Sequence, residues 1–350
     1  MNRPRINAAF AFAFAFAAAA CSAESTKDQG KLDLPPDAPP RADTVDDPEL
    51  PQPTPGSGTT LQPTTPANEA TPEDPATKPA TMPAAPASAC DLTKPFGAPE
   101  LLSAFSTTAY ETGGRFSADE LTFYFSRASS GNMQPMMAKR PAKDQAWGKS
   151  TVITAVDTST YDDSYFMTTA DGLTAFMIST RQGDLDVFRT TRTSTTATWT
   201  APALINAVMT TSTEDDVWVV PNGSAIYFDS NRSGNWELYR AAIDESGAVK
   251  APAVVAGGPT TVGDETNPVV TPDELTMYFS RASGSQQEIR VSHRASVTEQ
   301  WGQSALVTEL NSTSNDRVTW VSDDGCRVVV SSSRAGGAGS NDLYLATRPQ

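Results

Sequence analysis

Five carboxylates recur at one position of a repeating pattern, and they are the first residues whose types and spacing suggest chemistry. Each lies eight residues before a turn position, and the turn positions follow one another at intervals of 52, 51, 51 and 51 residues. The five acids are Glu111, Asp163, Glu214, Glu265 and Asp316. A ring of such groups could bind a cation or a basic peptide segment. Since the same acid recurs in every unit, we favour a structural role, because a catalytic pair should break the symmetry.

An arginine follows the apolar run of each repeat unit, eight or ten residues after the turn position. The turn positions are Asp119, Asp171, Asn222, Asp273 and Asp324, and the arginines are Arg127, Arg181, Arg232, Arg281 and Arg334. If the acids begin one strand and the arginines end the next, both sets meet at one rim around a central channel. We therefore expect each acid to pair with a nearby arginine. Exposed pairs contribute only about 0–1 kcal/mol each, but a partly buried ring holds its members mutually.

Aromatic residues near the same rim offer a second kind of site. They are Tyr110, Tyr161, Tyr165, Trp218 and Trp320. Aromatic faces beside carboxylates could receive a sugar, and glycosidases use two or three acids. The alternative is that these residues belong to the packing between blades. The acids that break the repeat symmetry are Asp162, Asp215, Asp216 and Asp264.

Several enzyme classes are excluded by what the chain lacks. The single histidine, His293, rules out multi-histidine metal sites and most imidazole general bases. The three cysteines form no CxxC pair, and there is no G-x-S-x-G nucleophile elbow. We therefore expect no cofactor, no catalytic residue and no metal site other than the candidate cation ring of the five repeated acids. His293 is expected to be a surface or structural residue.

The repeat itself predicts the architecture. Each turn of D-E, D-G or N-G type precedes five to seven residues rich in aromatic and β-branched side chains, which indicates a tight hairpin and a strand. A further strand ends in an acid, an apolar and an aromatic residue, as in 186–188 and 237–239, and a fourth strand starts at Trp147, Trp199 or Trp301. Four strands in about 51 residues are typical of a propeller blade. Residues 90–350 are thus predicted to be an all-β, five-bladed propeller.

The ring is predicted to close through its N-terminal strand. Phe96-Gly97 stands 23 residues before Asp119, as Trp199 stands 23 residues before Asn222. Residues 93–103 should therefore complete the last blade, which has no room for its own fourth strand. This places Cys90 in the blade that contains Cys326. We expect a disulfide between them, worth about 4–5 kcal/mol on the loop-entropy model, with two unpaired cysteines as the alternative.

These motifs carry a resemblance. The pattern D-[EG]-L-T-x-Y-F-S-x-R, followed by a D-L-Y step, resembles the WD40-like repeat called PD40 that occurs in TolB-like propellers of the bacterial envelope. The resemblance covers residues 90–350 and implies a propeller fold. TolB has a six-bladed propeller and a separate N-terminal domain, so its partners are not transferred to this chain.

The N-terminal region predicts export. Residues 1–20 have two arginines and then an apolar run that is too short to span a bilayer. Ala18-Ala19-Ala20-Cys21 resembles the lipobox of bacterial lipoproteins, which implies that Cys21 carries the lipid and that Ser22 permits sorting to the outer membrane. The alternative is ordinary cleavage with an incidental Cys21. Residues 21–89 are proline-rich and acidic, which predicts a disordered tether.

The net charge of −15 makes nucleic acid an improbable partner. Taken together, the sequence predicts an outer-membrane lipoprotein, periplasmic or surface facing, that is monomeric and touches the membrane only through the Cys21 lipid. Its propeller rim would contact an envelope protein, a glycan or another small ligand as a non-enzymatic binding or scaffolding module. The alternative is a carbohydrate-binding or glycoside-hydrolase-like five-bladed propeller.

Overall fold

The structure is a computed structural model that describes residues 90–350. The predicted signal peptide (1–20), the lipidation site Cys21 and the predicted tether (21–89) lie outside the described residues. Within residues 90–350, no helix is long and apolar enough to cross a membrane.

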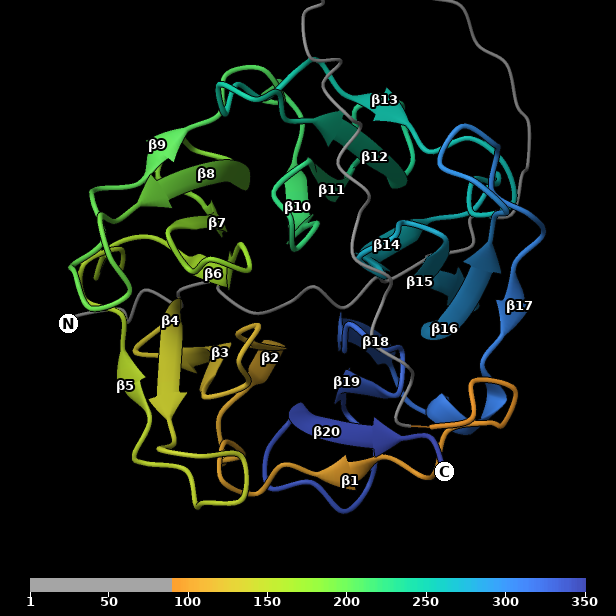
Figure 1. Cartoon of the computed structure of the whole chain (residues 1–350), viewed down its shortest axis with the longest axis horizontal. Helices are drawn as coiled ribbons and strands as arrows, with labels where there is room; N and C mark the ends of the chain where they lie inside the picture. The colour runs from red at the N-terminus through yellow and green to blue at the C-terminus, as the bar shows by residue number, and fades with distance from the viewer. Residues whose placement is uncertain (1–89) are drawn as a thin grey trace, which may run out of the picture. The chain divides into compact units, whose positions relative to one another are not determined.

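Five four-stranded antiparallel sheets form a ring, which confirms the predicted five-bladed propeller (Figure 1). The innermost strands are β2 (Glu111–Phe116), β6 (Asp163–Thr168), β10 (Glu214–Val219), β14 (Glu265–Val270) and β18 (Asp316–Val321). The second strands are β3 (Thr122–Ser129), β7 (Thr174–Ser179), β11 (Ala225–Ser230), β15 (Thr276–Ser283) and β19 (Arg327–Ser332). The third strands are β4 (Asn132–Lys139), β8 (Asp186–Thr191), β12 (Glu237–Ala242), β16 (Gln286–His293) and β20 (Asp342–Thr347).

The outer strands are much shorter than the others. They are β5 (Thr151–Val152), β9 (Ala203–Leu204), β13 (Ala253–Val254), β17 (Ala305–Leu306) and β1 (Glu100–Leu101), and one 3-10 turn, η1 (Thr308–Leu310), follows β17. We number the blades from first to fifth by their innermost strands, β2, β6, β10, β14 and β18.

The prediction that the outer strands start at the aromatic residues is wrong by four residues, because the residue after each aromatic makes a single hydrogen bond to the end of the third strand before the strand pairing begins. The guanidinium groups of Arg140, Arg192 and Arg294 stack over the rings of Trp147, Trp199 and Trp301, respectively. The distances from Cζ to the ring centroid are 4.2–4.4 Å. Arg348 stacks over Phe96 in the same way, at 3.9 Å. The register that equated Phe96 with the tryptophans is therefore confirmed.

The ring closes as predicted. Strand β1 pairs with β20 through Glu100 and Leu345, so the first strand in the chain completes the fifth blade beside its last strand (Figure 1). Cys90 and Cys326 form a disulfide with their Cα atoms 5.7 Å apart. The paired strand is only two residues long, so much of the closure rests on the disulfide and on loop contacts such as the Gly97 N–H bond to the Thr347 carbonyl at 2.8 Å.

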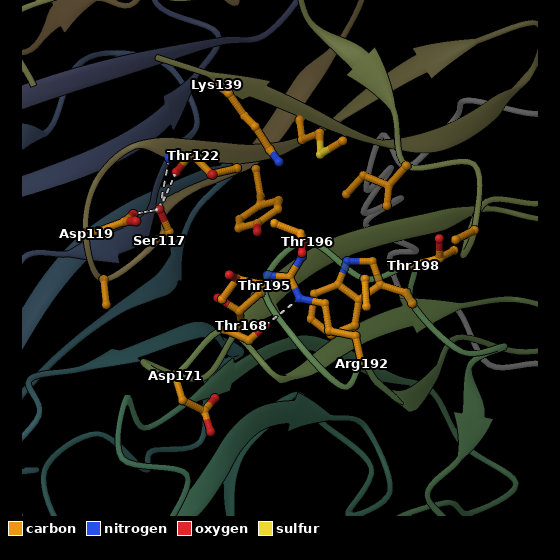
Figure 2. A pocket seen from close by; sticks show the side chains of 18 of the residues that line it. Ser117, Asp119, Thr122, Lys139, Thr168, Asp171, Arg192, Thr195, Thr196 and Thr198 are labelled. Carbon is orange, nitrogen blue, oxygen red and sulfur yellow. Dashed lines mark hydrogen bonds between the residues drawn. The ribbon is translucent and has the colours of Figure 1, made fainter. Parts of the chain in front are cut away.

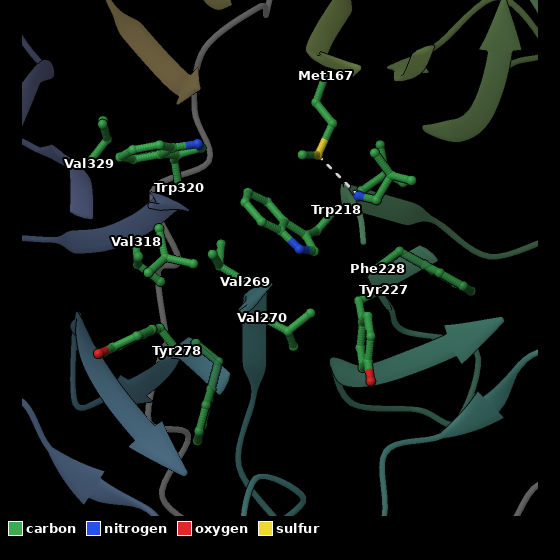
Figure 3. Packing of buried hydrophobic residues seen from close by; sticks show 14 of the residues in the cluster. Met167, Trp218, Tyr227, Phe228, Val269, Val270, Tyr278, Val318, Trp320 and Val329 are labelled. Carbon is green, nitrogen blue, oxygen red and sulfur yellow. Dashed lines mark hydrogen bonds between the residues drawn. The ribbon is translucent and has the colours of Figure 1, made fainter. Parts of the chain in front are cut away.

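The apolar faces of the blades pack against one another to form the core. Trp218, Tyr227 and Phe228 of the third blade are fully buried and belong to one cluster with Val269 and Val270 of the fourth (Figure 3). A second, smaller cluster lies between the first and second blades and includes Tyr124, Phe166 and Trp199. Burial of aromatic and β-branched side chains on both sheet faces explains why the strands read as nearly continuous apolar runs.

A β-bulge interrupts the pairing of every innermost strand with the second strand of its blade. In four blades the residue two positions after the repeated acid adopts a left-handed backbone: Gly113, Tyr165, Asp216 and Asn267, with φ from 47° to 63°. This conformation is strained for residues other than glycine, and such strain concentrates at functional sites. A functional site is therefore expected among the side chains of the innermost strands.

Candidate functional site at the propeller centre

The repeated acids and arginines form one ion pair in each blade. The N–O distances are 2.8 Å for Arg127–Glu111, 2.5 Å for Arg181–Asp163, 3.0 Å for Arg232–Glu214, 2.8 Å for Arg281–Glu265 and 2.7 Å for Arg334–Asp316. All five carboxylates are completely buried. Each pair lies within a single blade, as the sequence favoured.

The same carboxylates also hold the loop that enters each innermost strand. Glu214 accepts hydrogen bonds from the Thr210 backbone N–H at 3.0 Å and from its hydroxyl at 2.7 Å. Arg232 donates in turn to the Val208 carbonyl at 2.7 Å. The other blades repeat this arrangement through Thr107, Thr158, Thr261 and Ser312. A cation at this ring would have to displace five guanidinium groups, so the geometry supports the structural interpretation.

The two symmetry-breaking acids outside the third blade also serve the scaffold. Asp162 accepts the Met133 N–H at 2.7 Å, and Asp264 accepts the Trp236 N–H at 3.0 Å. In both cases the partner belongs to the third strand of the preceding blade or the loop before it. These two carboxylates therefore tie neighbouring blades together.

The predicted ligand aromatics do not form one group. The expectation that Trp218 and Trp320 lie near the acid rim is wrong. Both are buried near the opposite ends of their strands, where they line a cavity of about 230 Å³ together with hairpin-turn residues such as Ser117 and Asp323. Their strands are six residues long, so a position four residues after the acid lies close to the turn end. Tyr161 is 40% exposed.

Tyr110 and Tyr165 do lie beside charged groups in the centre. The Tyr110 hydroxyl is 3.4 Å from Nη1 of Arg317, whose Nε donates to Gln287 Oε1 at 2.6 Å. Tyr165 occupies the left-handed bulge position of the second blade and stacks against Arg115, with Cζ 5.4 Å from its centroid. The central polar group therefore combines phenols with two arginines.

Three carboxyl groups of the third blade complete this central group. Asp215 pairs across the sheet with Asp229, and the Asp215 carboxylate accepts the Asp216 N–H at 2.8 Å. Asp216 is 5% exposed, and its Oδ1 has no hydrogen-bond partner among residues 90–350. Burial and neighbouring carboxylates hold the pKa values of Asp215 and Asp229 well above the usual range.

Asp216 has a more moderate environment than its neighbours. Burial raises its pKa to about 6, while a Tyr165 hydrogen bond and the charges of Arg115 and Arg317 oppose that rise. A carboxyl group with such a pKa exists in both protonation states near neutral pH. It can therefore donate or accept a proton, or bind ligands of either hydrogen-bonding type.

Sequence reasoning singled out Asp215 and Asp216 but missed Arg115, Arg317, Asp229 and Asn267. Burial lowers the pKa of Arg115 to about 10, with partial compensation from Asp216 and Tyr165. Asn267 occupies the left-handed position of the fourth blade, and its buried Nδ2 has no partner among the described residues. The sequence offered one signal for Asn267, because it stands two residues after the repeated acid, as Asp216 does.

The remaining sites are described by what surrounds them. Among residues 90–350, no group of three or more His, Cys, Asp or Glu side chains could hold a metal ion. His293 lies at the end of β16, where Nδ1 is 3.0 Å from the Thr276 hydroxyl. A groove of about 520 Å³ lies between the first and second blades, on the side where hairpin turns connect the innermost strands with the second strands (Figure 2).

Several solved structures are similar to this chain. The chain is similar to TolB from Acinetobacter baumannii, with a TM-score of 0.41 and 15% identity, covering 69% of this chain and 55% of that one. It is similar to a TolB protein from Agrobacterium tumefaciens, with a TM-score of 0.43 and 14% identity, covering 73% of this chain and 99% of that one.

It is also similar to a thermostable family-43 glycoside hydrolase, with a TM-score of 0.50 and 14% identity, covering 70% of this chain and 91% of that one. No protein-family model matches the chain, and no curated protein sequence matches it. At 14% identity the likeness to the family-43 glycoside hydrolase shows the fold alone, so the function has to be argued from the site.

Proposed function

We propose that this protein is a cell-envelope binding module, anchored by a lipid on Cys21, whose propeller binds its ligand at the central group formed by Asp215, Asp216, Asn267, Arg115 and Arg317. The ligand is a segment of an envelope protein or a glycan. Either one presents groups that both donate and accept hydrogen bonds, such as amides and hydroxyls.

One observation carries the proposal. The five repeated acids are closed off by their arginines, whereas the central group breaks the five-fold symmetry and leaves polar atoms without partners. Asp216 Oδ1 is an unpartnered acceptor and Asn267 Nδ2 an unpartnered donor among residues 90–350. Because an unsatisfied buried polar group is costly, a ligand group that satisfies both would bind favourably there.

The proposed location rests on the N-terminal sequence. An apolar run that ends in Ala-Ala-Ala-Cys at position 21, followed by a proline-rich segment, suits a lipid-anchored domain held away from a membrane. Expression of the full chain in a bacterial host tests this part. Detergent-phase partitioning should be lost in Cys21→Ser and retained in Cys326→Ser.

Capture of envelope components tests the binding proposal. The wild-type propeller and Asp216→Asn, which keeps the side-chain size and tolerates the left-handed backbone, would be compared on envelope extracts and on a glycan array. We expect Asp216→Asn to lose at least tenfold in capture, with the exposed Asp144→Asn as the matched control. Equal capture by wild type and Asp216→Asn would refute the central site.

A second function is favoured by one feature, the pKa of about 6 at Asp216. A protonated carboxyl beside other carboxyls is the chemistry of a glycosidase general acid. The domain would then release reducing sugar from a polysaccharide. Hydrolysis that is present in the wild type and abolished in Asp216→Asn would establish this alternative, and absence of hydrolysis across a polysaccharide panel would leave the binding function.

A further inference from the structure

The groove between the first and second blades is a place where a repeated contact is incomplete. Two other blade junctions contain a buried glutamate from the hairpin turn, one residue after the turn position. At the junction of the third and fourth blades this residue is Glu274, and at the junction of the fifth and first blades it is Glu120. In the other three blades the same position is a glycine, Gly172 in the second blade, Gly223 in the third and Gly325 in the fifth.

The Glu274 carboxylate shows what such a site requires. It accepts a hydrogen bond from the Tyr227 hydroxyl at 2.6 Å and two from Arg240 at 2.7 and 3.0 Å. The guanidinium of Arg294 lies 3.6 Å away and stacks over Trp301. A phenol, a stacked arginine and a second cation thus surround one carboxylate.

The groove repeats the phenol and the stacked arginine of this set without the carboxylate, while Met137 stands at the register position of Arg240. Tyr124 occupies the register position of Tyr227, since each stands five residues after its turn position. Arg192 corresponds to Arg294, and it stacks over Trp199 at 4.2 Å. All three residues, Tyr124, Arg192 and Trp199, line the groove.

Arg192 and Arg294 also make the same backbone hydrogen bond. Arg192 Nε donates to the Gly172 carbonyl at 2.6 Å, as Arg294 Nε donates to the Glu274 carbonyl at 2.7 Å. A Cβ atom placed on Gly172 would lie 3.2 Å from Nη2 of Arg192. The side chain that is missing at Gly172 would therefore start directly beside this guanidinium.

Lys139 supplies a second cation. It lines the groove (Figure 2). Its ammonium group has no carboxylate within 4.0 Å among residues 90–350, whereas Lys143 pairs with Glu120 at 3.2 Å. Burial raises the pKa of Tyr124, although Arg192 opposes the rise, so its phenol stays protonated and able to donate.

The two acids at the groove edge are already engaged in their own turns. Asp119 Oδ1 accepts the Ser117 hydroxyl at 2.6 Å, and Asp171 Oδ1 accepts the Thr169 hydroxyl at 2.6 Å. Hydrogen bonds from Thr169 and Leu173 lower the pKa of Asp171. The charges of both acids limit the anion affinity of the groove, so a ligand also needs contacts with uncharged groups. Hydroxyl groups are provided by the threonines Thr122, Thr154, Thr168, Thr195, Thr196 and Thr198.

We propose that this groove binds a small hydroxylated carboxylate of the sugar-acid class, whose carboxylate takes the place that the turn glutamate occupies at the other two junctions. Arg192, Lys139 and Tyr124 bind the carboxylate, and the threonines bind the hydroxyl groups. The volume of about 520 Å³ accommodates a ligand of one or two sugar units. This site is separate from the central group and does not depend on it.

The test uses D-glucuronate as the probe, with D-glucose as the uncharged control, measured by NMR titration of residues 90–350 with the disulfide intact. Gly172→Glu supplies the missing carboxylate from the chain itself. Glutamate tolerates this backbone, because Glu120 and Glu274 have φ values of 57° and 55°. We expect glucuronate to bind the wild type at least tenfold more tightly than glucose, and Gly172→Glu to bind glucuronate at least tenfold more weakly and to melt at a higher temperature.

Gly223→Glu is the matched control. It makes the same substitution at the same turn position of the third blade, where the residue that corresponds to Arg192 is Ile243. It should bind glucuronate like the wild type. Tyr124→Phe, whose side chain has almost the same volume, is a second variant that keeps the proposal testable if Gly172→Glu does not fold. It should weaken glucuronate binding because the phenol hydroxyl is removed. Equal binding of glucose and glucuronate, no binding of either, or unchanged binding in both Gly172→Glu and Tyr124→Phe would each overturn the proposal.

Discussion

Arg115 of the first blade donates from Nη1 to the carbonyl oxygen of Val217 in the third blade, at 2.5 Å. The same guanidinium also donates to the carbonyls of Tyr165 in the second blade, at 2.9 Å, and of Thr319 in the fifth, at 3.2 Å. All three accepting groups lie at or beside bulges of innermost strands. One side chain therefore joins four blades at the centre of the ring.

Replacement of Arg115 should destabilise the whole propeller. Arg115→Met keeps much of the volume but leaves three buried carbonyls with one donor fewer each, and an unsatisfied buried polar group costs about 1–3 kcal/mol. We expect a loss of about 3–5 kcal/mol in the free energy of unfolding, measured by urea denaturation. Arg189→Met, on the third strand of the second blade, is the control. A loss below about 1 kcal/mol in Arg115→Met would contradict the bridging role.

The ion pairs inside the blades should be worth far more than their surface counterparts. Arg281→Met leaves the fully buried Glu265 without its guanidinium, which should cost about 3–5 kcal/mol. Lys94→Met removes an exposed pair with Asp91 at 3.9 Å and should cost less than about 1 kcal/mol. Chemical denaturation of both variants measures the difference, and similar losses would contradict the assignment.

The carboxyl groups of the third blade should make stability depend on pH. The folded-state pKa of Asp216, about 6, lies above its usual value of 3.8, so the protonated form favours the folded state. This contribution is fully present below about pH 4 and is lost as pH rises through about 6, on the order of 3 kcal/mol in all. Asp186, whose pKa burial and Glu214 also raise to about 6, acts in the same direction.

Urea midpoints between pH 4 and pH 7.5 measure this effect. In Asp216→Asn the decline in midpoint over that range should be smaller than in the wild type, because the amide does not titrate. The exposed Asp144→Asn should keep the wild-type slope. Parallel slopes in wild type and Asp216→Asn would show that Asp216 ionises as freely in the folded domain as in the unfolded chain.

Removal of the disulfide should open the ring at the fifth blade. The bond closes a sequence separation of 236 residues, and the loop-entropy model gives about 5 kcal/mol for such a loop. Cys90→Ser with Cys326→Ser should lower the melting temperature, and hydrogen exchange at the amides of β1 and β20 should increase first. Unchanged exchange at these two strands would show that the loop contacts alone close the ring.

The repeat could be read from the sequence because every unit must meet the same local requirements. A turn of fixed geometry needs Asp or Asn, and a strand buried on both faces needs a run such as the AIYF of residues 225–228. The same logic located Phe96 and Cys90, since a ring has to be completed by the strand that its last unit lacks. The pairing of acids with arginines followed from their places at neighbouring strand ends.

The central group could not be read in this way. Arg115 donates to three carbonyl oxygens that belong to other blades. No spacing in the chain predicts that these four residues come together. Trp218 and Trp320 were placed at the wrong end because the pattern alone did not give the length of the innermost strand. That strand has six residues, which puts a residue four positions after the acid close to the turn. The exposure of each repeated acid likewise depends on how its arginine and entry loop fold over it.

The sequence by itself determined the blade count, the closing strand, the disulfide partners and the separation of repeated from unrepeated residues, because these are properties of local pattern and chain order. Only the tertiary structure decided that the repeated carboxylates are sealed, that Asp216 shares its surroundings with Arg115 and Arg317, and that Gly172 leaves Arg192 and Tyr124 without the carboxylate found at two other junctions. Burial and contact between blades arise from packing in three dimensions, and they set the charges and the unfilled contacts on which function depends.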